Sequence, residues 1–248
     1  MLDQLVVKPG PVGGLWRTQQ LAATKLGIPS PPPYLSLSRN DDAFLNGINY
    51  ASGGAGILNE TGVYFIQRLT FDDQINCFKK TKEVIRAKIG DRAANKHVND
   101  AMYFIGLGPL GCIPSQRVKS KTGMCLKRVN EWVMEFNTRT TKLLEDLNKR
   151  LPGAKFAFAD TYPAVLDLID NPTRYGFKVA NTSCCNVDTS VGGLCLPNSK
   201  MCKNRKDFVF WDAFHPSDSA NQILADQLFS SLLSSSSHSP APAPKNNY

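Results

Sequence analysis

The sequence has no run of eighteen apolar residues, the length that a helix needs to cross a lipid bilayer, so we expect no membrane span. None of its seven cysteines has the Cys-x-x-Cys spacing of a zinc ribbon, and a single histidine lies near the main cysteine cluster. No glycine-rich loop is followed by the Lys-Ser or Lys-Thr of a phosphate-binding P-loop. We therefore expect neither a metal nor an organic cofactor.

A secretory leader is also missing at the start. The first residues, MLDQLVVKPGPVGG, have no basic beginning and no apolar stretch of the required length. We expect residues 1–14 to be an unstructured leader and the Ser/Pro/Ala-rich residues 236–248 to be a disordered tail. The part between them, 15–235, is long enough for one domain with a sizeable core.

The chain is rich in positive charge, with a formal net charge of +8. Much of it lies in KKTKEVIRAKIGDRAANKH, residues 79–97, which reads as a basic helix. This helix is either a solvated face or a surface that attracts anions such as an acidic polysaccharide. No aromatic residue interleaves with the basic ones, so we expect no nucleic-acid partner.

The cysteines favour disulfide bonds over metal binding, because four of them lie in a loop rich in Gly, Asn and Ser. Disulfides imply an oxidising, extracellular compartment. The glycosylation sequons at Asn59 and Asn181 point the same way. The pairing stays open, and Cys77 is the cysteine that we expect to be unpaired. The disulfide candidates are Cys112, Cys125, Cys184, Cys185, Cys195 and Cys202.

Apolar periodicity predicts strands that alternate with helices. The expected helices are 15–28, 65–90, 125–153, 162–172 and one that begins near Ser217. The expected strands are the start of 48–58, then 101–108, 154–160 and 208–212, and residues 176–207 form the cysteine-rich loop. This alternation predicts an α/β layered domain with a mostly parallel sheet.

The stretch FVFWDAFHPSDSANQ, residues 208–222, places an Asp and a His three residues apart, at Asp212 and His215. A histidine can act as general base near neutral pH, and an aspartate that holds its second ring nitrogen fixes the tautomer. The flanking Trp211 and Pro216 stiffen the turn, as a positioned base requires. Spacing alone also allows a purely structural Asp-x-x-His.

The glycine-rich loop ASGGAG, residues 51–56, brings backbone N–H groups together with little side-chain bulk. Such a loop can stabilise the oxyanion of an acyl-transfer reaction. It can equally be a tight turn between a strand and a helix.

Taken together, NYASGGAGIL, GLGPLGCIP, GFKVANTSCCNVDTSVGGLC and DAFHP resemble, in this order, the plant GDSL esterase/lipase family of SGNH hydrolases. The resemblance covers about residues 15–235. It implies a flavodoxin-like three-layer sandwich. It also implies hydrolysis of small-molecule or lipid esters through an acyl-enzyme, without cofactor, by a secreted and monomeric enzyme.

The family's catalytic blocks carry over only in part. Asp212 and His215 match the family's Asp-x-x-His, and Gly54 matches its oxyanion glycine, with Gly53 and Gly56 as alternatives. The nucleophile block Gly-Asp-Ser and the oxyanion block Gly-x-Asn-Asp occur nowhere. The chain reads as if two strands were joined at Gly-Leu-Gly, residues 106–108, with roughly sixty residues absent, about one βαβ unit with its loops.

The missing blocks predict an incomplete sandwich with unpaired strand edges and exposed apolar surface. They also predict that the chain is inactive, since neither Ser52 nor Ser115 lies on the sharp strand-to-helix turn that exposes a nucleophile. Two alternatives stay open. One is a non-catalytic extracellular protein that binds acidic cell-wall polymers, and the other is the product of a mis-spliced or wrongly assembled esterase gene.

Overall fold

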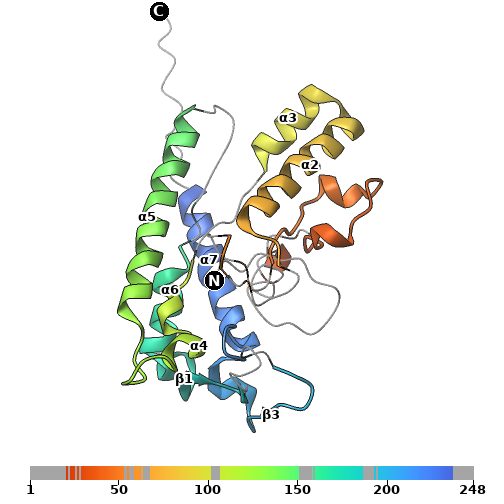
Figure 1. Ribbon diagram of the computed structural model, residues 1–248. Coiled ribbons are helices and arrows are strands. Elements are labelled where there is room, and N and C mark those ends of the chain that lie inside the picture. Colours follow the sequence, from red (N-terminus) through yellow and green to blue (C-terminus); the bar gives the residue numbers. More distant parts are fainter. Residues whose placement is uncertain are drawn as a thin grey trace, which may run out of the picture.

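The computed structural model describes residues 21, 23–25, 27, 29–52, 55, 59–61, 63, 68–101, 107–150, 158, 160–186, 193 and 195–236. Within these ranges helices dominate, and the long helices α5 and α7 run through one part of the molecule while α2 and α3 form a separate pair (Figure 1). The predicted leader, and residues 237–248 of the tail, lie outside the described residues.

Helix α2, Phe71–Ile89, begins later than the periodicity predicted. Thr70 caps it, because its hydroxyl accepts a hydrogen bond from the Asp73 backbone at 3.2 Å. The Asp73 carboxylate accepts one in return from the Thr70 N–H at 2.9 Å, which completes a capping box. The Thr70 hydroxyl also donates to Asp73 Oδ2 at 2.7 Å, and this bond, together with the one from the Thr70 N–H, lowers the pKa of Asp73. The described residues 68–70 before the cap are not helical, so the predicted start at residue 65 is wrong.

Helix α2 ends at Gly90, as the periodicity of residues 65–90 predicted, so the basic segment 79–97 is not one helix. It is divided at Gly90, where φ is +80°, and the second part belongs to helix α3, Asp91–Asp100. Positive φ is costly for residues with a side chain, and glycine tolerates it, so Gly90 ends α2 and starts α3. The two helices pack against each other. The short helices η1, Tyr34–Ser36, and η2, Asp42–Leu45, precede them, and η2 contacts α2.

Helix α5, Lys127–Arg150, binds the backbone at Leu107 and Gly111, at and just after residues 106–108, where two strands are predicted to be joined. Its buried Asn137 accepts a hydrogen bond from the Leu107 N–H at 3.2 Å and donates one to the Leu107 carbonyl at 2.8 Å. About two turns of helix nearer its start, Asn130 accepts from the Gly111 N–H at 2.7 Å. Because both amides lie among apolar residues, these bonds satisfy backbone groups that would otherwise be buried unpaired.

Small elements connect the larger ones. Helix η3, Leu110–Cys112, and helix α4, Pro114–Arg117, follow each other directly. Helix α6, Tyr162–Asp170, ends close to its predicted limit and is followed by η4, Pro172–Tyr175. The remaining helices are η6, Arg205–Asp207, and α7, Asp218–Ser236.

The described strands form two short sheets. Strand β1, Val179–Ser183, pairs in parallel with β4, Phe208–Phe210, and β2, Cys185–Asn186, pairs antiparallel with β3, Lys200–Met201. Three of these strands lie inside residues 176–207, which the sequence predicted as a loop. Helices with a short parallel strand pair are consistent with the predicted α/β domain, whose sheet is incomplete within the described residues. The predicted strands 101–108 and 154–160 lie mostly outside the described residues.

Among the described residues, the cluster with the most buried members joins α6, β4 and α7, and Phe214 of the turn that follows β4 packs against it. Its members are largely aliphatic and aromatic, and burial of such side chains is the main stabilising term in folding. They are Cys112, Ile113, Leu168, Ile169, Phe177, Ala180, Val209, Phe210, Ala220 and Leu224.

We expect Gly111→Ala to destabilise the fold by about 1–3 kcal/mol, because the added Cβ has no room. It would overlap the carbonyl oxygen of Leu126 and lie 2.7 Å from Asn130 Oδ1. The matched control is Gly108→Ala, whose Cβ would meet only Val165, at an ordinary 3.7 Å. Urea unfolding at constant m-value measures both, and equal midpoints for the two variants would contradict the prediction.

Candidate functional site

The turn between β4 and α7 places Asp212 and His215 side by side. The backbone closes on itself here, since the Trp211 N–H donates to the His215 carbonyl at 2.8 Å. The Ser217 N–H donates to the Val209 carbonyl, also at 2.8 Å, just before α7 begins. The turn is therefore a narrow loop fixed at its base by backbone hydrogen bonds.

The side chains of the pair contact each other directly. His215 Nδ1 lies 2.9 Å from Asp212 Oδ1 and 2.8 Å from Oδ2. Asp212 Oδ1 also accepts the backbone N–H groups of Phe214, at 2.9 Å, and His215, at 2.8 Å. Asp212 is 3% exposed and His215 is 7% exposed, so water does not screen this contact.

This geometry fixes the chemistry available to the imidazole. A carboxylate that accepts at Nδ1 keeps the Nδ1 proton in place and leaves Nε2 as the nitrogen able to take up a proton. It also stabilises the imidazolium that forms when Nε2 is protonated. The two backbone N–H groups fix the carboxylate, so the ring is held in one orientation before any reaction. The structure therefore brings the predicted Asp and His together in a geometry suited to general base catalysis.

The glycine-rich loop can be described only at its edges. Gly54, the predicted oxyanion donor, lies outside the described residues, as do Gly53 and Gly56. Ser52 is described and is 1% exposed, and its hydroxyl accepts a hydrogen bond from the Leu69 N–H at 2.7 Å. Ser52 thus connects two segments of backbone, which is a structural role.

Ser115 lies closer to the turn than the sequence indicated. Its backbone N–H donates to the Ala213 carbonyl at 2.9 Å, within the Asp212–His215 turn. Its hydroxyl oxygen is buried and has no hydrogen-bond partner within the described part of the chain. Because a buried hydroxyl is not exposed on a sharp turn toward a substrate, its placement differs from that of a serine nucleophile.

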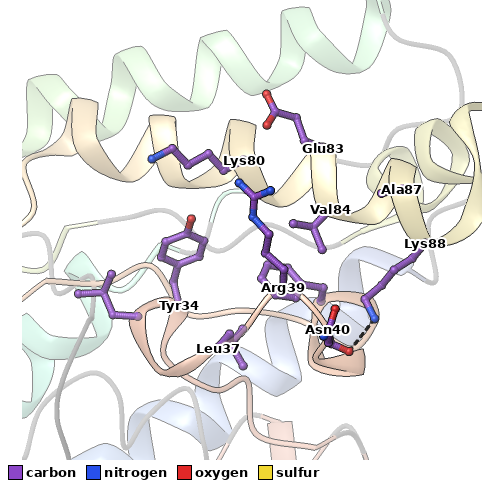
Figure 2. Close-up of a pocket in the computed structure, with 11 residues that line it drawn as sticks. Tyr34, Leu37, Arg39, Asn40, Lys80, Glu83, Val84, Ala87 and Lys88 are labelled. Carbon is purple, nitrogen blue, oxygen red and sulfur yellow. Dashed lines mark hydrogen bonds between the residues drawn. The ribbon is translucent and has the colours of Figure 1, made fainter.

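A separate hollow of about 470 Å³ lies between η1, η2 and the exposed side of α2. Figure 2 shows Arg39 extending from the loop toward α2 in the region of Lys80 and Glu83. The ammonium group of Lys88 already has protein partners, because its Nζ donates to the Asn40 carbonyl at 2.8 Å and lies 3.1 Å from Asp42 Oδ1. The hollow is lined by Tyr34, Leu35, Leu37, Arg39, Asn40, Phe44, Lys80, Glu83, Val84, Ala87 and Lys88. Sequence reasoning found the basic helix but not the loop residues opposite it.

Cys77 is the unpaired cysteine, as predicted, and it is not an activated thiol. Burial raises the pKa of the Cys77 thiol. Burial likewise raises the pKa of Tyr34, which shares a side-chain hydrogen bond with Cys77. Both groups are therefore protonated at neutral pH, and Cys77 is not a substitute for a serine nucleophile.

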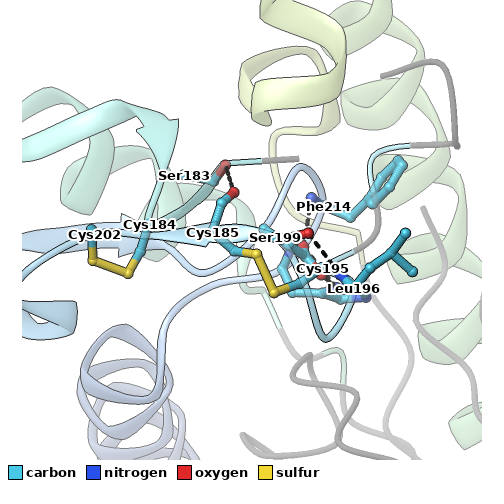
Figure 3. The surroundings of a disulfide bond; sticks show 10 residues. Ser183, Cys184, Cys185, Cys195, Leu196, Ser199, Cys202 and Phe214 are labelled. Atoms are coloured by element: carbon cyan, nitrogen blue, oxygen red, sulfur yellow. Dashed lines mark hydrogen bonds and ion pairs between the residues drawn. A yellow bond between two sulfur atoms is a disulfide. The ribbon is translucent and has the colours of Figure 1, made fainter. Parts of the chain in front are cut away.

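The six predicted disulfide cysteines are all paired. Two of the bonds hold the segment beside the Asp212–His215 turn, and Figure 3 shows Phe214 of that turn on the side of Cys195. The sequence left three pairings open for the clustered four, and the fold selects one of them. The bonds are Cys112–Cys125, Cys184–Cys202 and Cys185–Cys195.

The described residues contain no cluster of three or more His, Cys, Asp or Glu side chains suited to a metal ion. None of the helices in the described ranges combines the length and the apolar character needed to span a bilayer. Both sequon asparagines are exposed. Asn59 donates to Asp72 Oδ2 at 3.0 Å, and Asn181 lies on β1.

Residues 86–228, more than half of the chain, match the model of the family described as GDSL-like Lipase/Acylhydrolase. The chain is similar to the Arabidopsis thaliana protein named GDSL esterase/lipase At5g37690, with 72% identity over 91% of this chain and 78% of the relative. It is 36% identical to GDSL esterase/lipase At1g74460 of the same plant, over 89% of this chain and 76% of the relative. GDSL esterase/lipase 7, also from Arabidopsis thaliana, is 35% identical over 84% and 74%, respectively.

These alignments are longer than the part of this chain that they contain. Ninety-one per cent of 248 residues is about 226, so about 50 of the 278 positions aligned with the first relative fall opposite gaps in this chain. For the second relative, 89% of 248 is about 221, and about 60 of 280 positions fall opposite gaps. The chain thus lacks internal positions that both relatives have, in about the number that the joint at 106–108 predicted.

Proposed function

Because the chain belongs to the GDSL-like lipase/acylhydrolase family, we propose that it is an inactive relative of carboxylic-ester hydrolases that keeps the acid and base but lacks a nucleophile. Asp212 and His215 are the retained pair. The observation that carries this proposal is their buried contact of 2.8 Å, held by backbone N–H groups. The substrate class of the ancestral site is a small-molecule or lipid ester, bound by a single chain without cofactor.

In the mechanism that the family implies, a serine Oγ attacks the ester carbonyl while its proton passes to Nε2 of the histidine. That proton then goes to the departing alcohol, and water hydrolyses the acyl-enzyme with the same base. His215 is positioned for both transfers, and Asp212 stabilises the imidazolium between them. An oxyanion donor at Gly54 completes the proposed site.

We expect a loss of activity because the first step, attack of a serine Oγ on the ester carbonyl, needs a nucleophile that the chain lacks. The 248 residues contain no Gly-Asp-Ser and no Gly-x-Asn-Asp. The hydroxyl of Ser52 is held by the Leu69 N–H, and the hydroxyl of Ser115 is buried, which argues against either as a replacement. Without a nucleophile, a triad retains only weak catalysis from its remaining groups. The test is reaction with a fluorophosphonate probe, which modifies an activated serine, and we expect no labelling that depends on His215.

We further propose that the protein is an extracellular glycoprotein of lipid metabolism. Three disulfides support an oxidising compartment, since such bonds rarely persist in the cytosol. The exposed sequons Asn59 and Asn181 are the proposed glycosylation sites. Release of glycans by an endoglycosidase, followed by a mass shift at these two asparagines, would identify them.

The hollow beside α2 supports a second candidate function, the binding of acidic cell-wall polymers. Arg39 and Lys80 line it, and within the described part of the chain neither forms an ion pair. Two cations facing one hollow attract carboxylates of a polyuronate, although Glu83 on the same wall opposes them. Lys88, paired with Asp42, contributes less.

We expect the double variant Arg39→Gln/Lys80→Gln to elute from a polygalacturonate column at clearly lower salt than the parent chain. The matched control is Lys142→Gln/Arg150→Gln, which removes the same charge from the exposed side of α5. If net charge alone attracts the protein to the column, removing two positive charges lowers retention equally in both variants, because salt screens all exposed charges similarly. Equal elution of the two variants would therefore rule out a specific role for the hollow.

A further inference from the structure

We infer that the Cys185–Cys195 bond and Gly193 position the Asp212–His215 pair, and that Gly193 is the point of contact with the turn. The inference rests on the proposed role of this pair as acid and base. The first observation is at the start of the loop. The Cys184 N–H donates to the Phe210 carbonyl at 3.0 Å, and the Cys185 N–H donates to the Trp211 carbonyl at 2.7 Å.

Trp211 links the loop to the histidine. Its carbonyl accepts from Cys185, and its own N–H donates to the carbonyl of His215 at 2.8 Å. The backbone of Cys185 is therefore connected to the backbone of His215 by two hydrogen bonds, with Trp211 as the single residue between them. A displacement of Cys185 is transmitted to both ends of the narrow turn.

The far end of the same loop contacts the middle of the turn. Gly193 has a φ of +77°, and a Cβ built on it would lie 2.8 Å from the Cβ of Ala213 and 3.2 Å from Cε2 of Phe214. Only a residue without a side chain allows this approach. Gly193 is two residues from Cys195, whose bond to Cys185 keeps both ends of the loop against the turn.

A second disulfide-bonded segment supports the turn through Ala213. The Ser115 N–H donates to the Ala213 carbonyl at 2.9 Å, and Ser115 follows closely on Cys112, which is bonded to Cys125. Ala213 and Phe214 thus lie between two crosslinked segments. The Phe214 N–H in turn donates to Asp212 Oδ1, so movement at this residue alters the carboxylate that orients the ring.

These contacts affect the exact position of the His215 ring more than the stability of the fold. A base displaced by about 1 Å loses much of its effect, and loops rarely hold side chains that closely without support. The Cys185–Cys195 bond and Gly193 provide that support. Gly193 acts through Phe214 and Asp212 on the ring of His215, without itself reaching a substrate.

The experiment is NMR of the histidine rings in the purified, oxidised chain, observing the hydrogen-bonded Nδ1 proton of His215. We expect Gly193→Ala to shift this signal or to broaden it beyond detection by exchange. The matched control is Gly176→Ala, because Gly176 also has a positive φ, +82°, but a Cβ there would meet no atom within 4 Å. The control has the same backbone strain, so its His215 signal is expected to stay in place.

A compensating variant separates positioning from general damage. In Gly193→Ala/Ala213→Gly the methyl group is moved from the turn to the loop, which removes the closest overlap, and we expect the Nδ1 proton signal to return. An unchanged signal in Gly193→Ala, an equal loss in Gly176→Ala or a failure of the compensating variant would overturn the inference. The readout does not require hydrolysis, so the fluorophosphonate experiment tests the proposed function separately.

Discussion

Labelling of the purified chain by a fluorophosphonate is expected to be about 10⁶-fold slower than labelling of a family member with an intact Gly-Asp-Ser, a loss typical of removing a triad serine. In the proposed site the buried Asp212–His215 pair can accept a proton, but no activated hydroxyl is expected to supply one. Ser52 Oγ already accepts the Leu69 N–H, and Ser115 Oγ is buried. The measurement is the rate of probe incorporation, followed by mass spectrometry of the digested protein.

Two controls decide how this result is interpreted. His215→Ala should leave the residual labelling unchanged, because no serine depends on this base. If one serine is modified, and the modification disappears in His215→Ala, a replacement nucleophile exists and the chain is an active esterase. Circular dichroism of the same sample must show the helices of the structure, so that absence of reaction is not absence of fold.

Asp212→Ala is expected to lower the free energy of unfolding by about 3–5 kcal/mol, the range for breaking a buried polar pair by removing one partner. The carboxylate accepts the N–H groups of Phe214 and His215 and contacts the imidazole, and it is 3% exposed. Alanine leaves all three donors in a buried site, and each unsatisfied group costs about 1–3 kcal/mol. Urea denaturation measures the loss.

The control for this variant is Asp218→Ala, because Asp218 is exposed at the start of α7. An acidic residue in the first turn of a helix contributes about 0.3–1 kcal/mol, so the control should change the urea midpoint little. If Asp212→Ala lowers the free energy of unfolding as little as Asp218→Ala does, Asp212 is an ordinary surface carboxylate in solution. That outcome would contradict the buried geometry on which the proposed site depends.

Asp212→Asn refines the same experiment. The asparagine oxygen can still accept the two backbone N–H groups, so we expect most of the stability to remain. Its NH₂ group cannot accept the ring proton, so the His215 proton should move from Nδ1 to Nε2, the tautomer unsuited to a base. Nitrogen chemical shifts of the ring distinguish the two tautomers. If Asp212→Asn is as unstable as Asp212→Ala, the negative charge itself stabilises the turn.

The local sequence was sufficient to predict the structure where a single short segment determines it. Asp212 and His215 were found because a turn of four residues brings their side chains together without help from the rest of the chain. The end of α6 was predicted well, since the Asn171-Pro172 step stops a helix. The start of α2 was missed because the capping pair of Thr70 and Asp73 overrides the apolar periodicity around it.

By itself the sequence determined the family, the proposed acid and base, the cysteines available for disulfides and the absence of a Gly-Asp-Ser block, because each depends on residue identity at short spacing. Only the tertiary structure decided which cysteines pair, where the hollow beside α2 lies and that Gly193 presses against Ala213. These depend on segments that are distant in sequence, and their contacts follow from packing of the whole core. No spacing rule encodes that packing, because backbone approach and burial are properties of the folded chain.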